Sequence, residues 1–249
     1  PTWIGELYFE FHRGTYTSMA RNKRGNRKSE YAMMELELLS VLAENAGKAY
    51  PTEELNRMWE MILTNQFHDI LPGSSIHEVY EQTKKEYAEI AETSAKLIGE
   101  RMEALCGTKD ESVTVWNTLG HRRNDVVVLG ETAAEAMTDG TTVYPVQQTK
   151  DGAIVYAENL PSKGYQVLRP TSGAAAETPF AVTEAGEGYT LETPFYTIQI
   201  DANGEFTSLF DKENDREVLQ SGTTGNELRI YEDKPLQYSA WNLDIFHTE

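Results

Sequence analysis

The sequence has little cysteine, few basic residues for its length and no long apolar run. Its single cysteine, Cys106, excludes an internal disulfide, and such a low content is typical of proteins in a reducing compartment such as the cytoplasm. No segment reaches the roughly 20 apolar residues that span a bilayer, so no membrane is expected as a partner. The net charge of −18, from 22 basic and 40 acidic residues, disfavours binding to nucleic acids, whose phosphates are also negative.

Motifs that bind phosphate groups or activate a serine are missing as well. The chain has no Gly-rich phosphate loop, no dinucleotide fingerprint and no nucleophile elbow. Its one basic cluster, RNKRGNRK at residues 21–28, is short and precedes a helical pattern. We interpret this cluster as a solvated loop, because short charge runs are usually exposed.

Helical periodicity dominates residues 1–107. Apolar residues recur at helical spacing in three segments, which begin near Ser29, at Pro51 and at Ser75. The predicted apolar stripes are Met34, Leu38, Val41 and Leu42 in the first segment, Leu55, Met58, Trp59, Ile62 and Leu63 in the second, and Ile76, Val79, Tyr80, Tyr87, Ile90, Leu97 and Ile98 in the third. Such helices with short connections predict an antiparallel three-helix bundle, preceded by a lead-in strand over residues 5–18.

From residue 108 to residue 249 the pattern changes to a two-residue period. Strands are predicted at residues 113–117 and 124–129, and Asn203-Gly204 marks a hairpin turn within residues 195–219. The expected fold class is α+β, with the helical bundle followed by a mainly antiparallel β-sandwich. Because the chain starts without Met and ends in a strand-like stretch, we expect a piece of a longer polypeptide whose sandwich is incomplete here.

Polar and aromatic side chains gather in the lead-in strand. Tyr8, Glu10 and His12 alternate with apolar residues, so they share one face of the predicted strand, and Arg13 and Tyr16 follow closely. Carboxylates and arginine suit sugar hydroxyls, and aromatic faces suit sugar rings. The alternative is an amphipathic edge strand with a solvated face, and the pattern alone does not separate the two.

His68 and Asp69 form a second candidate site, at the predicted end of the second helix. Imidazole is the commonest protein ligand of transition metals, and an adjacent carboxylate can hold a substrate hydroxyl. The alternative is a helix terminus that His68 stabilises through the helix dipole and Asp69 caps. No HExxH, CxxC or HxH motif accompanies the pair, so this chain alone does not provide a complete zinc site.

Three long stretches resemble, in the same order and spacing, the α-mannosidases of glycoside hydrolase family 38. They are GELYFEFHRGTYTSMARNKRGNRKSE (5–30), ILTNQFHDILPGSSIHEVY (62–80) and YEDKPLQYSAWNLDIF (231–246). The resemblance covers nearly the whole chain. It implies that residues 1–107 are the helical middle domain of these enzymes and that residues 108–249 begin their C-terminal β domain.

The resemblance implies a retaining, zinc-dependent exo-α-mannosidase that acts on mannose-containing oligosaccharides or mannosides. His68 matches the zinc-binding histidine of the family's HD motif, and Asp69 matches a residue that hydrogen-bonds mannose hydroxyls. The stretch from Glu10 to Tyr16 matches a segment that lines the pocket. Its implied roles are general acid for Glu10 and substrate binding for His12, Arg13 and Tyr16.

The resemblance also implies that the nucleophile and the other zinc ligands lie in an N-terminal domain outside this sequence. The fragment is therefore expected to be inactive alone. Two other functions stay open at this point: a non-catalytic carbohydrate-binding or scaffold module, and a metal-independent glycosidase that acts through Glu10. A homo-oligomer is a further possibility.

Overall fold

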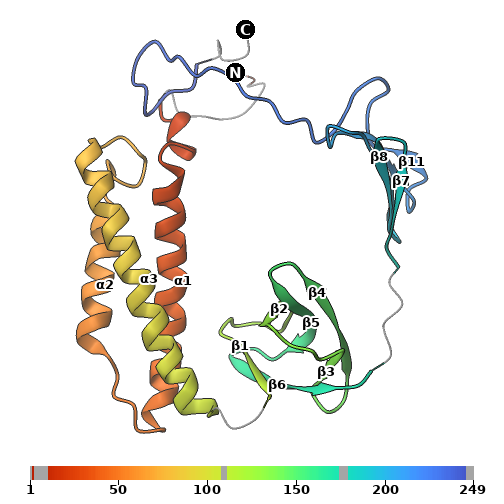
Figure 1. The fold of residues 1–249 in the computed structure, drawn as a ribbon. Coiled ribbons are helices and arrows are strands. Elements are labelled where there is room, and N and C mark those ends of the chain that lie inside the picture. The colour runs from red at the N-terminus through yellow and green to blue at the C-terminus, as the bar shows by residue number, and fades with distance from the viewer. Residues whose placement is uncertain (1, 3–10, 108–110, 174–178, 245–249) are drawn as a thin grey trace. The chain divides into compact units, whose positions relative to one another are not determined.

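The computed structural model describes residues 2, 11–107, 111–173 and 179–244. Three long helices are followed by two antiparallel sheets, which confirms the predicted α+β class (Figure 1). The chain divides into two compact units, residues 1–171 with 232–249 and residues 172–231. The domain boundary at residue 107 and the sandwich arrangement of the β part stay predictions.

The helical part consists of α1 (Ala20–Glu44), α2 (Thr52–Asn65) and α3 (His77–Cys106), preceded by the short 3-10 helix η1 (Gly14–Tyr16). The buried residues of α1 recur mostly at alternating spacings of three and four, which places them on one face of the helix. They are Asn22, Asn26, Ser29, Met33, Leu36, Leu39, Ser40 and Ala43. The stripe is therefore polar in its first half and, except for Ser40, apolar in its second half.

The predicted stripe of the first helix was in the wrong register. Met34 and Val41 are 59% and 54% exposed, and Leu63 of α2 and Ile76 before α3 are exposed too. The basic cluster at residues 21–28, predicted as a loop, lies within α1. Both errors have one cause: the first members of the buried stripe are polar, so a search for apolar periodicity starts the helix too late.

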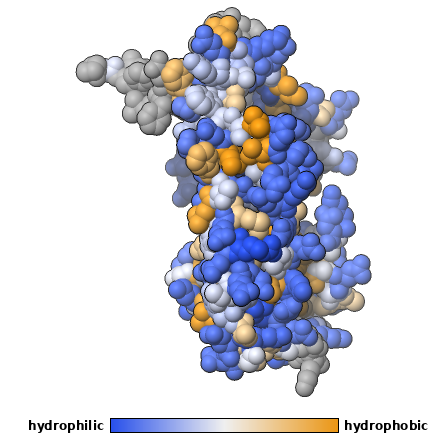
Figure 2. Space-filling view, turned by 90° about the vertical axis from the view of Figure 1, so that its left-hand side faces the viewer, coloured by the Kyte–Doolittle hydropathy of each residue, from blue (hydrophilic) through white to orange (hydrophobic). Residues whose placement is uncertain are grey.

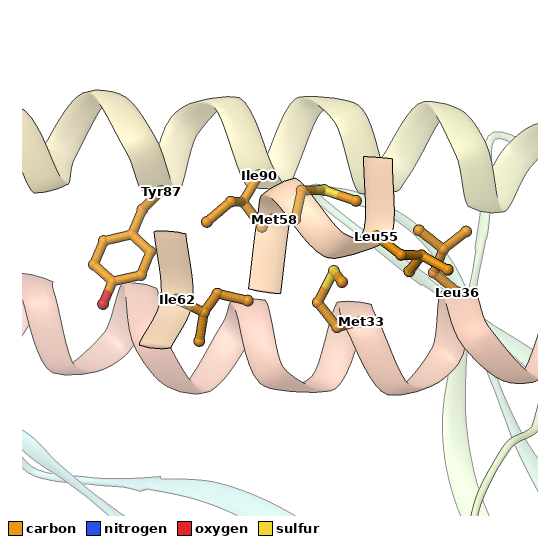
Figure 3. Close-up of a cluster of buried hydrophobic side chains, with 7 residues drawn as sticks. All are labelled: Met33, Leu36, Leu55, Met58, Ile62, Tyr87 and Ile90. Carbon is orange, nitrogen blue, oxygen red and sulfur yellow. The ribbon is translucent and has the colours of Figure 1, made fainter. Parts of the chain in front are cut away.

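One apolar cluster joins the three helices (Figure 3). Its buried members are Met33 and Leu36 from α1, Leu55, Met58 and Ile62 from α2, and Tyr87 and Ile90 from α3. In Figure 3 Tyr87 lies at one end of the cluster and its hydroxyl points toward α1. Burial of an aliphatic side chain of this size contributes about 1.5–3 kcal/mol, so this cluster is a main source of the bundle's stability.

Six strands form the first sheet, in the order β1-β6-β3-β4-β5-β2 with antiparallel neighbours. They are β1 (Val113–Asn117), β2 (Arg123–Gly130), β3 (Ala136–Thr138), β4 (Val143–Thr149), β5 (Gly152–Leu160) and β6 (Gly164–Thr171). The strands predicted at residues 113–117 and 124–129 are confirmed as β1 and β2. Side chains from β3, β4, β5 and β6 meet in one buried cluster: Met137, Tyr144, Val155, Ala157, Leu160 and Leu168.

The unit of residues 172–231 contains the second sheet, in the order β11-β10-β9-β8-β7. Its strands are β7 (Ala181–Ala185), β8 (Gly188–Glu192), β9 (Tyr196–Ile200), β10 (Phe206–Asp211) and β11 (Arg216–Glu217). The predicted hairpin at Asn203-Gly204 is confirmed between β9 and β10. An Asp201 carboxylate oxygen accepts the backbone N–H groups of Asn203 and Glu205, at 2.8 and 2.9 Å, and so stabilises the turn.

The surface of the bundle agrees with the acidic, hydrophilic composition. The face shown in Figure 2 is mostly hydrophilic, with apolar side chains in small separate patches. Within the described part of the chain, no helix has both the length and the apolar character to cross a membrane.

Gly25 allows α1 and α3 to approach each other closely. A Cβ atom at Gly25 would lie 2.6 Å from Cδ2 of Tyr87, whose ring belongs to the core, whereas a Cβ at Gly99 of α3 would meet nothing within 4 Å. We expect Gly25→Ala to lower the melting temperature, although alanine normally favours a helix over glycine by about 1 kcal/mol. Gly99→Ala is the matched control and should raise it. A similar gain at both positions would show that the helices are not in contact at Gly25.

Asp139 organises the turn between β3 and β4. Its Oδ1 accepts the backbone N–H groups of Thr142 and Thr141 and the Thr141 hydroxyl, and its Oδ2 accepts from Tyr144 and Gln166. The backbone N–H of Thr142, followed by the two groups of Thr141, holds the pKa of the Asp139 carboxyl well below its usual range. A carboxylate with a depressed pKa stabilises the fold only while it is ionised.

We therefore expect Asp139→Asn to destabilise the first sheet by roughly 1 kcal/mol at pH 7, after allowance for solvent screening, or a few degrees in melting temperature. The contribution is fully present above the unfolded pKa of about 3.9 and is lost as the pH falls further, through the folded pKa. The difference between wild type and variant should accordingly shrink below about pH 4 in thermal melts. Asp151→Asn, at the exposed β4–β5 turn, is the control. A difference independent of pH would contradict the assignment.

Candidate functional site

His68 and Asp69 lie in a turn between α2 and α3, which we call the HD turn (residues 66–76). α2 ends at Asn65, so the prediction that the helix itself ends in His-Asp was wrong. After Asn65 the backbone bonds tighten: the N–H of Phe67 donates to Thr64 and the N–H of Ile70 donates to Phe67, at 3.1 and 2.9 Å. Because the backbone leaves the α-helical path here, His68 and Asp69 lie outside α2, at the surface.

The side chains of His68 and Asp69 stand together and are accessible. Nε2 of His68 lies 3.4 Å from Oδ2 of Asp69, and the two side chains are 78% and 49% exposed. The Phe67 ring lies beside the imidazole, with ring centroids 4.2 Å apart. Within the described residues the Asp69 carboxylate accepts no backbone N–H of the turn, so the capping alternative finds no support there. Both groups are free to bind something outside the turn.

Side chains from α1 and α3 fix the HD turn through its backbone. Nδ2 of Asn22 donates to the carbonyl of Ile70 at 3.4 Å. The Tyr80 hydroxyl lies 3.4 and 3.2 Å from the carbonyls of Asp69 and Ile70 and accepts the N–H of Ser75 at 2.9 Å. Because these bonds involve main-chain atoms, they set the path of the turn that carries His68 and Asp69.

Lys23 links the HD turn to the start of the chain. Its Nζ donates to the carbonyls of Leu71 and Pro72, at 2.9 and 3.2 Å, and to the carbonyl of Ser18, at 2.6 Å. Burial lowers the pKa of Lys23. Gly73 of the HD turn packs against Ser18, since a Cβ atom at Gly73 would lie 2.8 Å from Ser18. The HD turn and residues 11–18 therefore lie side by side.

Residues 11–18, which we call the lead-in segment, are not a strand. Gly14–Tyr16 form η1, and His12 has a left-handed φ of 77°, so the predicted strand is wrong for this part. The alternation of polar and apolar residues misled the prediction, because Gly14 and the bonds of Thr15 and Ser18 to carbonyls at His12 and Gly14 favour a turn. Glu10 lies outside the described residues.

The other predicted substrate-binding residues lie at the surface of the lead-in segment. His12, Arg13 and Tyr16 are exposed, Tyr16 by 70%. The structure thus places the two predicted groups, the His68-Asp69 pair and the His12, Arg13 and Tyr16 set, on segments that meet at Ser18 and Gly73.

A third segment, residues 238–242, packs on the lead-in segment and was not predicted. The carbonyl of Trp241 accepts the N–H of Gly14 at 2.7 Å, and the carbonyl of Ala240 accepts the Ser18 hydroxyl at 2.9 Å. The Trp241 ring lies 4.6 Å from the His12 ring, centroid to centroid. Residues 231–246 were singled out above only for their resemblance to the family, because a contact with a segment more than 200 residues away leaves no local pattern in the sequence.

A polar layer supports the HD turn from inside the bundle. Nε2 of Gln66 donates to Oδ1 of Asn26 and Oε1 of Glu30, at 3.0 and 2.8 Å, and Nδ2 of the buried Asn65 donates to Oε2 of Glu86 at 2.9 Å. Burial, with the nearby carboxylates of Glu86 and Glu30, raises the pKa of Tyr87 to about 12. Amide and carboxylate pairs of this kind fix the end of α2 in one geometry.

The donors of the HD turn suit a metal ion but do not complete a site. Among the described residues, no three His, Cys, Asp or Glu side chains gather closely enough to hold a metal. His68 and Asp69 offer one imidazole and one carboxylate, both accessible and adjacent. Catalytic zinc sites typically use three protein ligands, so further donors would have to come from elsewhere.

A groove of about 460 Å³ lies between α1 and α3, and Asn22 and Tyr80, which hold the HD turn, are among its lining residues. Its lining combines small or apolar side chains, such as Gly25, Ala88 and Ala91, with basic residues such as Arg24 and Lys84. None of the six predicted site residues lines it. Size alone does not make it the functional site, so the site is assigned from the chemistry of the exposed groups.

Two family profiles match the chain. Residues 10–105 match the one described as the α-mannosidase middle domain, and residues 191–249 match the glycosyl hydrolases family 38 C-terminal domain. The HD turn, the lead-in segment and Lys23 fall within the first match, and residues 238–242 fall within the second.

Two known proteins are similar in sequence to this chain over nearly its whole length. Alpha-mannosidase 2C1 of Homo sapiens is 32% identical over 256 residues, with all of this chain and 23% of that protein covered. Alpha-mannosidase G of Dictyostelium discoideum is 30% identical, with 99% and 26% covered. The chain thus spans about a quarter of the length of these relatives.

Among solved structures, an α-mannosidase from Enterococcus faecalis V583 is similar in fold. The TM-score is 0.58 at 16% sequence identity, and the match covers 82% of this chain and 29% of the other. At this identity the likeness concerns the fold alone.

Proposed function

Because this chain belongs to glycoside hydrolase family 38, we propose that it is part of a retaining α-mannosidase that removes terminal α-linked mannose from oligosaccharides. The observation that carries the proposal is the exposed His68-Asp69 pair on a turn fixed by its backbone. An exposed imidazole and carboxylate held at one place are what a metal and sugar site needs. The single cysteine supports a cytoplasmic location for such an enzyme.

In this proposal His68 supplies one ligand to a zinc ion whose other ligands come from outside the chain. When bound, zinc would act as a Lewis acid that polarises and orients sugar hydroxyls. Asp69 accepts hydrogen bonds from mannose hydroxyls, and its position beside His68 allows both groups to reach the same sugar. A nearby cation would favour the ionised form that this role requires.

The lead-in segment contributes the remaining contacts in this proposal. His12, Arg13 and Tyr16 bind the substrate, and all three are exposed. Glu10 is the candidate general acid, since retaining glycosidases protonate the leaving oxygen with one carboxyl group while a second acts as nucleophile. The nucleophile would come from the part of the protein outside this chain.

We expect His68→Ala in the full-length protein to lower zinc content and activity together, by on the order of 10–100-fold or more in kcat/KM, because a metal ligand is lost. Zinc is measured by elemental analysis and activity with an aryl α-mannoside. His121→Ala removes an exposed imidazole from the connection between β1 and β2 and should change neither. Wild-type zinc content and turnover in His68→Ala would refute the ligand role.

Asp69→Asn should instead retain zinc and lose kcat/KM, because the neutral amide is a weaker acceptor for sugar hydroxyls. The same two measurements separate the two variants. An unchanged kcat/KM for the aryl α-mannoside would remove Asp69 from the site.

The chain of residues 1–249 by itself should not hydrolyse an aryl α-mannoside above background, with or without added zinc. One imidazole and one carboxylate do not make a three-ligand zinc site, and the proposed nucleophile lies elsewhere. Circular dichroism on the same sample verifies that the helices have formed. Tight stoichiometric zinc binding with turnover by the folded chain would overturn the view that the site is completed from outside.

A further inference from the structure

Lys23 is unlike the other cations of the basic cluster at residues 21–28. The other four, Arg21, Arg24, Arg27 and Lys28, are exposed. Lys23 is half-buried, and within the described part of the chain no carboxylate lies within ion-pair distance of its amine. Its three acceptors are all main-chain carbonyls, of Ser18, Leu71 and Pro72.

This arrangement lowers the stability of the charged form of Lys23. Taking an ammonium group partly out of water without an opposite charge is unfavourable, and the lowered pKa of Lys23 expresses that cost. Three carbonyl dipoles offset it by accepting the three N–H groups that an ammonium can donate. The acceptors come from two segments about 50 residues apart in the sequence, so one side chain connects them.

We propose that Lys23 is a positioning residue of the site: its ammonium fixes the HD turn against the lead-in segment. It thereby sets where His68 and Asp69 stand relative to His12, Arg13 and Tyr16. This inference rests on the proposed function, because it takes those five residues to act on one substrate. Within the described residues the Lys23 amine donates to main-chain carbonyls, so the proposed role involves no contact with the substrate.

Tyr80 and Asn22 hold the same turn but not the lead-in segment. Tyr80 contacts main-chain atoms of Asp69, Ile70 and Ser75, and Asn22 contacts the carbonyl of Ile70. The structure therefore separates two effects. Loss of the Tyr80 hydroxyl should loosen the HD turn alone, whereas loss of the Lys23 ammonium should loosen both segments.

The test is Lys23→Met in the full-length protein, with amide hydrogen exchange measured by mass spectrometry and activity measured with an aryl α-mannoside. We expect faster exchange in residues 66–76 and 11–18, with unchanged protection in the core turns of α2 and α3. We also expect kcat/KM to fall on the order of 10–100-fold, since displacement of a catalytic group by about 1 Å can cost 10²-fold. Lys28→Met, an exposed lysine of the same helix, is the control and should change neither quantity.

Tyr80→Phe is the second variant, because it removes one oxygen and retains the ring. It should speed exchange in residues 66–76 and leave residues 11–18 protected. A uniform rise in exchange across all three helices of Lys23→Met would assign Lys23 to global stability and overturn the inference, as would unchanged exchange and activity. If Lys23→Met fails to fold, Lys23→Gln, which keeps an N–H donor but lacks the reach and charge of the ammonium, is measured in the same way and judged by the same outcomes.

Measurement of His68→Ala in the same series distinguishes failure of the positioning role of Lys23 from failure of the ligand role of His68. If His68→Ala loses activity while Lys23→Met keeps both its protection and its activity, the positioning role alone is refuted. If His68→Ala is fully active, the role of His68 as a metal ligand in the proposed site fails, and the positioning role of Lys23 fails with it.

Discussion

The three helices are held together along one seam, whose residues recur at alternating spacings of three and four. At one end the seam carries methyl and methylene groups, such as those of Leu36 and Ile90, and at the other end it carries amides, such as those of Asn22 and Asn26. The apolar end supplies most of the hydrophobic free energy, because it removes hydrocarbon from water. The polar end uses the same helical geometry for a different purpose: its amides reach the backbone and the neighbouring helices beneath the exposed His68-Asp69 pair.

This division explains how much of the fold could be predicted from the sequence. The helices, the hairpin at Asn203-Gly204 and the first strands follow from local periodicity and turn chemistry, and the structure has all of them. The start and register of α1 could not be obtained in this way, because Asn22, Asn26 and Ser29 are buried yet polar. Their burial depends on hydrogen-bond partners elsewhere in the fold, such as Gln66 of the HD turn for Asn26. The periodicity of a single sequence does not show which residues become such partners.

The candidate site shows the same limit more sharply. His68 and Asp69 could be singled out because their chemistry is visible in the sequence, and the likeness of long stretches to a known family gave them roles. The residues that support them could not, since Lys23 and Tyr80 act through carbonyl groups that every residue has. The contact of Trp241 with His12 could not be predicted for a further reason: almost the whole length of the chain separates the two residues in the sequence.

The support of the HD turn by main-chain contacts has a consequence for its evolution. Asn22, Lys23 and Tyr80 form hydrogen bonds with main-chain atoms of the HD turn, not with its side chains. These three residues therefore place few restrictions on the identity of most residues in the HD turn. Substitutions there can alter what the loop offers to a ligand while its shape is inherited unchanged. A scaffold of this kind lets new recognition properties arise by exchange of side chains at a fixed position, without a new fold.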